Sequence, residues 1–442
     1  MEPLFLVLKH VWDGAAESPG IRQRGLRRVR SRDLGPRAAG EEPEPQEPGD
    51  PARDDRLPLR FDDVTDRCAV IARERREAAG LLAELRALPE EPRRRAIRRE
   101  RRYSSWHLSA LAIDGARFEA LEAPEQAEEL LEIGFDVLGR LSSRQASPSL
   151  LADLAVRSWA EAGHLCRLRG DLAAAEVALD AARTSARQGS GDLLEAARVF
   201  EVEAALRRDL GRFREAAAAA DKAIAIYRSC DEPEGLGRAC VERGRTQALS
   251  GDLEGAARSL RSGLANLWDP RDRSATLAAH LSLIGVLLES ERHRPEARFL
   301  LETLRPELLA RDGDLLSAQY CWLDGCLFAA LGNRAEAEAR LLEARAGFAR
   351  AHRSVELALA TLDLAVVLGE GGRIAELRVA VAEIPPLLAA SALPEKALAA
   401  IEKSLRRERL DLKTLRASER LLRRTRRERF FEVFPQRSSA RS

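Results

Sequence analysis

The stretch CWLDGCLFAALGNRAEAEARLLEA, residues 321–344, decides the fold of this chain. A small residue, Gly325, is followed by a Gly332-Asn333 turn and, twelve residues after Gly325, by Ala337. Apolar residues recur at helical spacing on both sides of the turn. Glycine commonly ends a helix, and small residues let two helices approach each other closely. The stretch therefore predicts an antiparallel pair of helices.

The same arrangement recurs about every forty residues, which is the signature of a solenoid of stacked helix pairs. The small residue of the first helix is Gly115, Gly163, Ala204, Gly244, Gly285, Gly325 or Ala365. Twelve positions later come Ala127, Ala175, Ala216, Ala256, Ala297, Ala337 and Leu377. Turns lie between them at Gly170-Asp171, Gly211-Arg212, Gly251-Asp252, Gly332-Asn333 and Gly372-Arg373. We expect an all-α fold: a right-handed superhelical solenoid of about seven antiparallel helix pairs.

The chain divides into four regions by composition and period. They are a disordered tail (1–60), an N-terminal helical segment with a basic helix (61–102), the solenoid (103–384), and C-terminal capping helices with a basic tail (385–442). The tail holds a basic run and then an acidic proline tract, which cannot continue a helix or bury a core. Breaks are predicted at Pro89 and Pro92, and a loop at Ser142 to Ser149. The capping helices follow from the need of a solenoid for a polar-faced end.

Composition restricts the compartment and the class of partner. The chain has 72 basic and 71 acidic residues, so net charge gives no support for binding polyanions over the whole surface. Six cysteines are scattered without a CxxC pair, and several fall on apolar helix faces. This pattern indicates free thiols in a reducing compartment. The apolar run Leu4 to Leu8 is too short for a signal core, and no run approaches twenty apolar residues. We expect a cytoplasmic protein that does not contact a membrane.

The repeats carry a family likeness. Its residues are Ala162-Gly163, Gly170-Asp171-Leu172, Ala175, Leu179 and Ala182, and more fully Gly325, Phe328, Gly332, Ala337, Leu341 and Ala344. They resemble the tetratricopeptide pattern, whose usual unit is about 34 residues. The longer period is similar to that of the sensor arms of bacterial transcription activators of the maltose-regulator type. The resemblance covers about two thirds of the chain, and it implies a bacterial interaction module in signalling or transcriptional regulation.

The sequence departs from those regulators in two places. No GxxxxGK[ST] loop occurs, so their ATPase module is missing. The region Asp62 to Leu111 does not form a convincing helix-turn-helix, since its break is rich in proline. In the first unit, Glu122 takes the place of the turn glycine.

No motif in the sequence predicts a catalytic, metal-binding or cofactor-binding site. The six histidines make no HxxxH or HExxH pair, and Cys321 and Cys326 lie five residues apart, on different faces of one helix. No GxSxG elbow or dinucleotide glycine motif follows a strand. We expect no catalytic residues, no metal site and no cofactor.

The first helix of each unit is expected to line the concave surface, so that residues beside its small residue face a groove. In the first half these are Arg157, His164, Arg167, Arg198, Glu201, Arg208, Arg238 and Arg245. In the second half they are Ser282, Val286, Glu289, Gln319, Trp322, Cys326, Leu359, Leu362 and Val366. The groove is thus predicted to be basic and then apolar.

This groove predicts a partner segment, extended or helical, that is acidic and has an apolar anchor. Its carboxylates would lie near Arg157, Arg198 and Arg238, because the guanidinium fork can bind a carboxylate with two hydrogen bonds. Its anchor would lie near Trp322. The alternative is that these arginines pair with glutamates on neighbouring helices and that Trp322 packs between repeats.

The leading functional prediction is a non-catalytic protein-interaction scaffold. The alternative is a nucleic-acid-associated regulatory protein that uses the basic helix Arg93 to Arg102 and the basic C-terminal helix. Nearby glutamates can pair with the arginines of the first of these, which favours a salt-bridged face instead.

Overall fold

The structure, a computed structural model, describes residues 61–143, 145–311, 315–351, 353–389, 399, 403 and 413–418, with side chains from Ile71 onward except that of Ala389. The predicted tail and most of the predicted capping region lie outside these residues. The described part contains seventeen α-helices, α2 to α18, three short 3₁₀ helices and no strand. The predicted all-α class is therefore confirmed.

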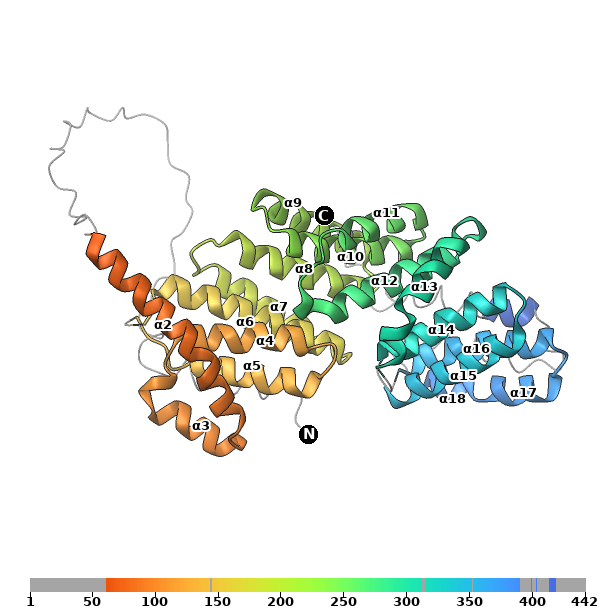
Figure 1. Ribbon diagram of the computed structural model, residues 1–442, viewed down its shortest axis with the longest axis horizontal. Helices are drawn as coiled ribbons and strands as arrows, with labels where there is room; N and C mark the ends of the chain where they lie inside the picture. The colour runs from red at the N-terminus through yellow and green to blue at the C-terminus, as the bar shows by residue number, and fades with distance from the viewer. Residues whose placement is uncertain are drawn as a thin grey trace, which may run out of the picture.

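Seven helix pairs follow one another along the chain, as the period predicts. They are α4 (Trp106–Glu119) with α5 (Pro124–Leu138), α6 (Pro148–Leu168) with α7 (Leu172–Ala186), α8 (Leu193–Asp209) with α9 (Phe213–Ser229), α10 (Pro233–Ser250) with α11 (Leu253–Leu264), α12 (Arg273–Leu288) with α13 (Arg294–Leu309), α14 (Leu315–Ala330) with α15 (Arg334–Arg350), and α16 (Ser354–Glu370) with α17 (Ile374–Ala382). Short 3₁₀ helices, η2 (Pro270–Asp272) and η3 (Glu291–His293), flank α12. Figure 1 shows α4 to α7 at one side, α8 to α12 above them, and α14 to α18 at the other side.

Further elements flank the solenoid. They are α2 (Phe61–Arg86), α3 (Glu90–Arg99) and η1 (Arg101–Tyr103) before it, and α18 (Ile384–Ala389) after it. The predicted break at Pro89 is confirmed. The loop predicted at Ser142 to Ser149 is confirmed up to Ser147, because α6 already begins at Pro148. The break at Pro92 is wrong, because Pro92 lies in the first turn of α3. Backbone N–H groups of a first turn have no helical partner, so proline is tolerated there.

The predicted turns are present. Gly170, Gly211, Gly251, Gly332 and Gly372 have φ values of 83°, 74°, 95°, 82° and 73°. This left-handed conformation is open to glycine at little cost. After two of these glycines, an aspartate begins the second helix: Asp171 accepts a hydrogen bond from the backbone N–H of Ala174, and Asp252 from that of Gly255, both at 2.9 Å. The Gly-Asp pairs therefore end one helix and begin the next.

The small residue of the first helix lies against the second helix of its own pair in several repeats. A Cβ atom at Gly325 would lie 2.9 Å from Cγ of Leu341, and one at Gly244 would lie 2.7 Å from Cγ of Leu260. These two positions have no room for a side chain. The period of small residues is thus set by helix–helix distance.

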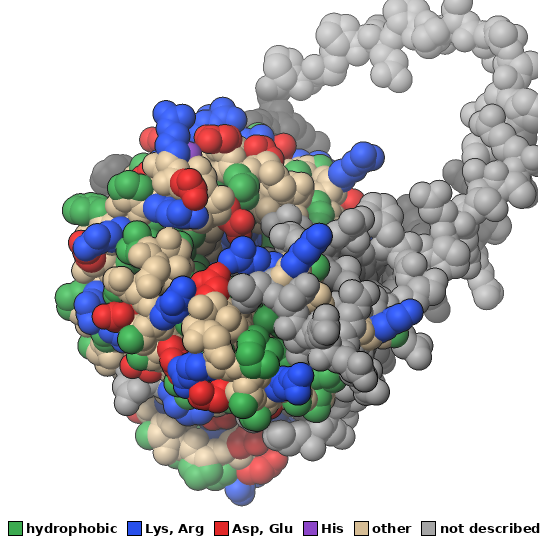
Figure 2. All heavy atoms as spheres, turned by 90° about the vertical axis from the view of Figure 1, so that its right-hand side faces the viewer, with side chains coloured by type: hydrophobic (Ala, Val, Ile, Leu, Met, Phe, Trp, Pro, Cys, Tyr) green, Lys and Arg blue, Asp and Glu red, His purple; other side chains and the backbone are tan. Residues whose placement is uncertain are grey.

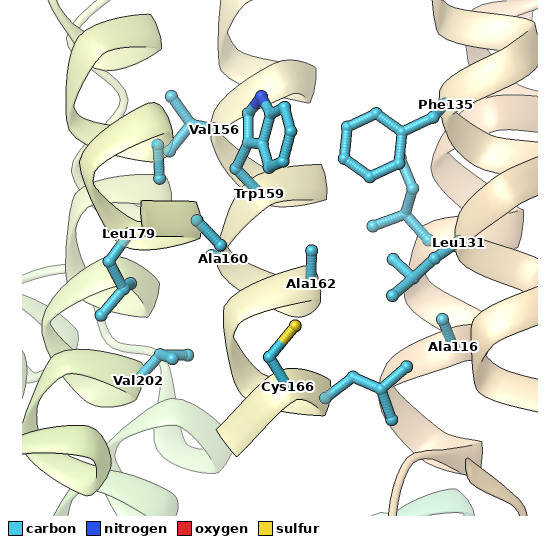
Figure 3. Close-up of a cluster of buried hydrophobic side chains, with 14 of the residues drawn as sticks. Ala116, Leu131, Phe135, Val156, Trp159, Ala160, Ala162, Cys166, Leu179 and Val202 are labelled. Atoms are coloured by element: carbon cyan, nitrogen blue, oxygen red, sulfur yellow. The ribbon is translucent and has the colours of Figure 1, made fainter. Parts of the chain in front are cut away.

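The core extends along the solenoid between successive pairs. In its first part, Trp159 of α6 packs edge-on against Phe135 of α5, with ring centroids 4.8 Å apart (Figure 3). Cys166 lies seven residues, or about two helical turns, further along the same helix and is buried. Cys240 and Cys321 are buried as well. These thiols occupy apolar helix faces, as the sequence predicts.

The solenoid curves far enough for its first pair to meet its fifth. Nη1 of Arg311, just after α13, donates to Oε1 of Glu122 between α4 and α5 at 2.8 Å. Nη2 of Arg117 on α4 lies 3.8 Å from Oδ2 of Asp272 in η2. Leu121 packs against the core of the middle repeats. The concave side is therefore bounded by residues that are up to 189 positions apart.

Candidate partner-binding cavity

The concave side encloses a cavity of about 2060 Å³. The C-terminal halves of α6, α8, α10 and α12 form part of its wall, and α14 and α16 contribute along most of their length. Apolar residues of α12, α14 and α16 contribute, including Val286, Trp322 and Val366. Figure 2 views the α14 to α18 end of the molecule, where basic and acidic side chains alternate over the visible face without a large area of one sign.

The predicted groove residues divide into two groups. Those that line the cavity are Arg167, Arg208, Arg245, Ser282, Val286, Glu289, Gln319, Trp322, Cys326 and Val366. Those that do not are Arg157, His164, Arg198, Glu201, Arg238, Leu359 and Leu362. The prediction is wrong for Leu359 and Leu362, because they are fully buried in the core of the last repeats.

The inner surface of the first half carries an interior ion-pair network of seven arginines and seven carboxylates among the described residues. Its arginines are Arg117, Arg157, Arg167, Arg198, Arg208, Arg238 and Arg245, and its carboxylates are Asp114, Glu161, Glu195, Glu201, Asp209, Glu242 and Asp272. Each arginine lies within ion-pair distance of at least one of these carboxylates. The expected basic half of the groove is therefore electrically balanced by the chain itself.

Arg198 lies at the centre of this network. Its Nε and Nη2 donate to the two carboxylate oxygens of Glu161 at 2.7 and 2.6 Å, and its Nη1 donates to Glu201 at 2.6 Å. Glu201 also accepts hydrogen bonds from Arg238 of the next repeat at 3.2 Å and from the Tyr227 hydroxyl at 3.0 Å. The side chain of Arg198 is 8% exposed. Its hydrogen bonds go to glutamates of its own chain, which is the alternative that the sequence left open.

Burial and charge act against each other in this network. Burial alone would raise the pKa of Glu201, but Arg198 and Arg238 outweigh it and lower that pKa. In the same way Arg208 and Arg245 hold the pKa of Glu242 at about 2. Burial and then the nearby arginines lower the pKa of His164 well below its usual value, so its ring is neutral at pH 7.

The carboxylates of the network could have been found from the sequence. Arg198 is 37 positions from Glu161, Arg238 is 37 from Glu201, and Arg157 is 38 from Glu195. These separations are two or three residues shorter than the repeat. An arginine in one first helix therefore reaches an acidic residue of a neighbouring first helix. Such pairs are missed when each repeat is examined on its own, because the two partners belong to different repeats.

Trp322 both lines the cavity and packs between repeats. Its Nε1 donates to Oδ2 of Asp363 on α16 at 2.7 Å, and its ring meets that of Phe348 edge-on with centroids 5.8 Å apart. Cys326 also donates to Asp363, at 3.6 Å. The ring is thus held rigidly while part of it remains accessible from the cavity.

The basic segment Arg93 to Arg102 is partly used within the fold. Arg93 is buried and pairs with Glu129 and Glu132 on α5. Arg94 pairs with Glu90 at 2.9 Å, and Arg102 with Glu84 at 2.8 Å. Of these contacts, the pairs of Arg93 hold α3 against α5 of the first repeat. Of the basic C-terminal helix in the alternative nucleic-acid surface, only residues 413–418 are described, and there Arg416 pairs with Glu370.

In the part of the chain that the structure covers, no three His, Cys, Asp or Glu side chains gather as they would around a metal ion. No helix there is long and apolar enough to cross a membrane. No protein-family model matches the sequence, and no curated protein matches it.

Proposed function

We propose that this chain is a non-catalytic protein-interaction scaffold and that it holds a segment of a partner protein in the concave cavity. The observation that carries this proposal is the cavity itself, with its volume of about 2060 Å³. Sites for small molecules usually have about 300–1,000 Å³. A helix about 10 Å across that rises about 1.5 Å per residue would fill the cavity with on the order of 15 residues.

The wall suits such a segment. Its apolar residues lie on helices packed into the core, and Trp322 is fixed by hydrogen bonding and ring packing, so little ordering of the wall is needed on binding. The five cysteines whose side chains are described are free, which supports a reducing compartment such as the cytoplasm. The resemblance to sensor arms supports a regulatory setting in bacteria.

The acidic character expected of the partner depends on free arginines. Arg157, Arg198 and Arg238 form ion pairs within the chain instead. The proposal therefore keeps the apolar anchor near Trp322 and takes no support from those three arginines.

Site-specific photo-cross-linking in cells tests this function. A photoreactive amino acid is placed in the cavity at Ser282 or at Gln319, and on the exposed outer side of α7 at Val177 as a control. We expect one contiguous segment of one protein to be cross-linked from both cavity positions and not from Val177. The same products from all three positions, or none from the cavity, would contradict the proposal.

A further inference from the structure

Among the described residues that line the cavity, no arginine is without an acidic partner. The arginines that line it are Arg167, Arg169, Arg208, Arg245, Arg294, Arg311, Arg353 and Arg416. Each lies within ion-pair distance of an acidic residue of the chain. An acidic segment would have to compete with these contacts.

One carboxylate of the cavity wall, that of Glu289, lacks the ion pair that each of these arginines has among the described residues. Glu289 lines the cavity, is exposed, and has no ion-pair partner among the described residues. It is the C-cap residue of α12, and the last turn of α12 contains no basic residue. The carbonyl groups at a helix C-terminus carry partial negative charge, so a cation is favoured there and a carboxylate alone is not. The first three solenoid helices on this side, α4, α6 and α8, have an arginine in their last turn.

The chain itself shows which kind of segment fits the corresponding place two helix pairs after α12, at the end of α16. Glu370 is the last residue of α16, and Nη2 of Arg416 lies 2.6 Å from its Oε1. The preceding residue, Leu415, is fully buried in the core of the last repeats. An apolar residue in the core thus stands beside a basic one that pairs at the end of this first helix, where Arg416 and Glu370 both line the cavity.

We infer that the cavity takes a partner segment that is apolar and basic, with a lysine or arginine at Glu289 and its apolar side chains against Val286 and Trp322. This inference rests on the proposed function, and it specifies the partner. The apolar contacts supply the affinity, because burial of apolar surface is the main favourable term in association. The ion pair at Glu289 selects the charge of the segment.

Two labelled peptides of about 15 residues test the inference. They share one face of Leu and Phe residues and differ only in that all polar positions are Lys in one and Glu in the other. Fluorescence anisotropy with the full chain measures both dissociation constants, at about 50 and 200 mM salt. We expect the Lys peptide to bind more tightly, and its advantage to shrink at the higher salt concentration.

Variants identify the residue responsible. Glu289→Arg should weaken binding of the Lys peptide by about threefold to fivefold at low salt. Glu336→Arg is the matched control, since Glu336 is also exposed but does not line the cavity, and it should change binding little. Equal or tighter binding of the Glu peptide would overturn this inference and leave the proposed function standing. If Glu289→Arg and Glu336→Arg changed the affinity for the Lys peptide equally, the inference would likewise be overturned and the proposed function would stand. If neither peptide binds up to about 1 mM, both the inference and the proposed function fail.

Discussion

Arg198 and Glu161 form a two-pronged ion pair inside the solenoid, in which both carboxylate oxygens accept from one guanidinium at 2.6–2.7 Å. The two residues belong to first helices of successive repeats, α8 and α6, and both side chains are less than a tenth exposed. Charges that are buried in this way are tolerated only while they remain paired. The pair therefore joins two repeats and makes the stability of each depend on the other.

The first prediction concerns removal of this guanidinium. Arg198→Met leaves the carboxylates of Glu161 and Glu201 buried with fewer cations, and should lower the free energy of unfolding by about 3–5 kcal/mol. Urea denaturation followed by circular dichroism measures the loss. The control is Arg298→Met, which breaks an exposed pair with Glu302 on α13 and should cost less than about 1 kcal/mol. Similar losses for both variants would contradict the account.

Charge reversal at two network positions gives the second prediction. Taken alone, the sequence predicts that Arg198→Glu with Arg238→Glu abolishes partner capture and leaves the helical fold intact. The structure predicts that this variant loses its cooperative unfolding transition, because four carboxylates would then meet in a buried space around Glu161 and Glu201. Thermal scans of circular dichroism distinguish the two outcomes. An unchanged melting curve would show that the network relaxes more readily than its burial indicates.

The sequence predicts the repeat far better than it predicts the site. Pairs, turns and glycine positions follow from short-range spacing, and all are present, from Gly170 to Gly372. The ion pairs join residues about one repeat apart, and they appear only when neighbouring first helices are aligned side by side. The contact between Glu122 and Arg311 depends on small rotations that accumulate over four repeats, which no local pattern encodes.

Two glycines at the same position of adjacent repeats give the third prediction. A Cβ atom at Gly244 would lie 2.7 Å from Leu260, whereas one at Gly285 would lie 3.7 Å from Leu323, an ordinary contact. Gly244→Ala should therefore lower the free energy of unfolding by about 1–3 kcal/mol, because α10 and α11 must separate. Gly285→Ala should raise it by up to about 1 kcal/mol, because alanine favours a helix over glycine. Equal urea midpoints for the two variants would contradict this explanation of the period.

The fourth prediction is a pH dependence at Glu242. Its pKa falls from 4.5 to about 2 on folding. A lowered pKa contributes stability that is fully present above pH 4.5 and is lost as the pH falls towards 2, amounting to about 3 kcal/mol. Glu242→Gln removes the charge at every pH. The difference in unfolding free energy between wild type and this variant should thus be large at pH 7 and shrink steadily below pH 4.5. A difference that stays constant from pH 7 to pH 3 would show that the Glu242 charge does not contribute.

The fifth prediction concerns the contact between the first and fifth pairs. Arg311→Glu replaces attraction to Glu122 by repulsion, so the solenoid should open on this side. Spin labels at the exposed positions Glu125 and Arg292 would report a broader and longer distance distribution. The pair is partly exposed and worth about 1 kcal/mol or less, so we expect a several-fold shift in population that weakens at high salt. Adding Glu122→Arg to the variant restores opposite charges and should restore the original distribution. If Arg311→Glu leaves the distances unchanged, the apolar packing of Leu121 against the middle repeats holds the curvature by itself.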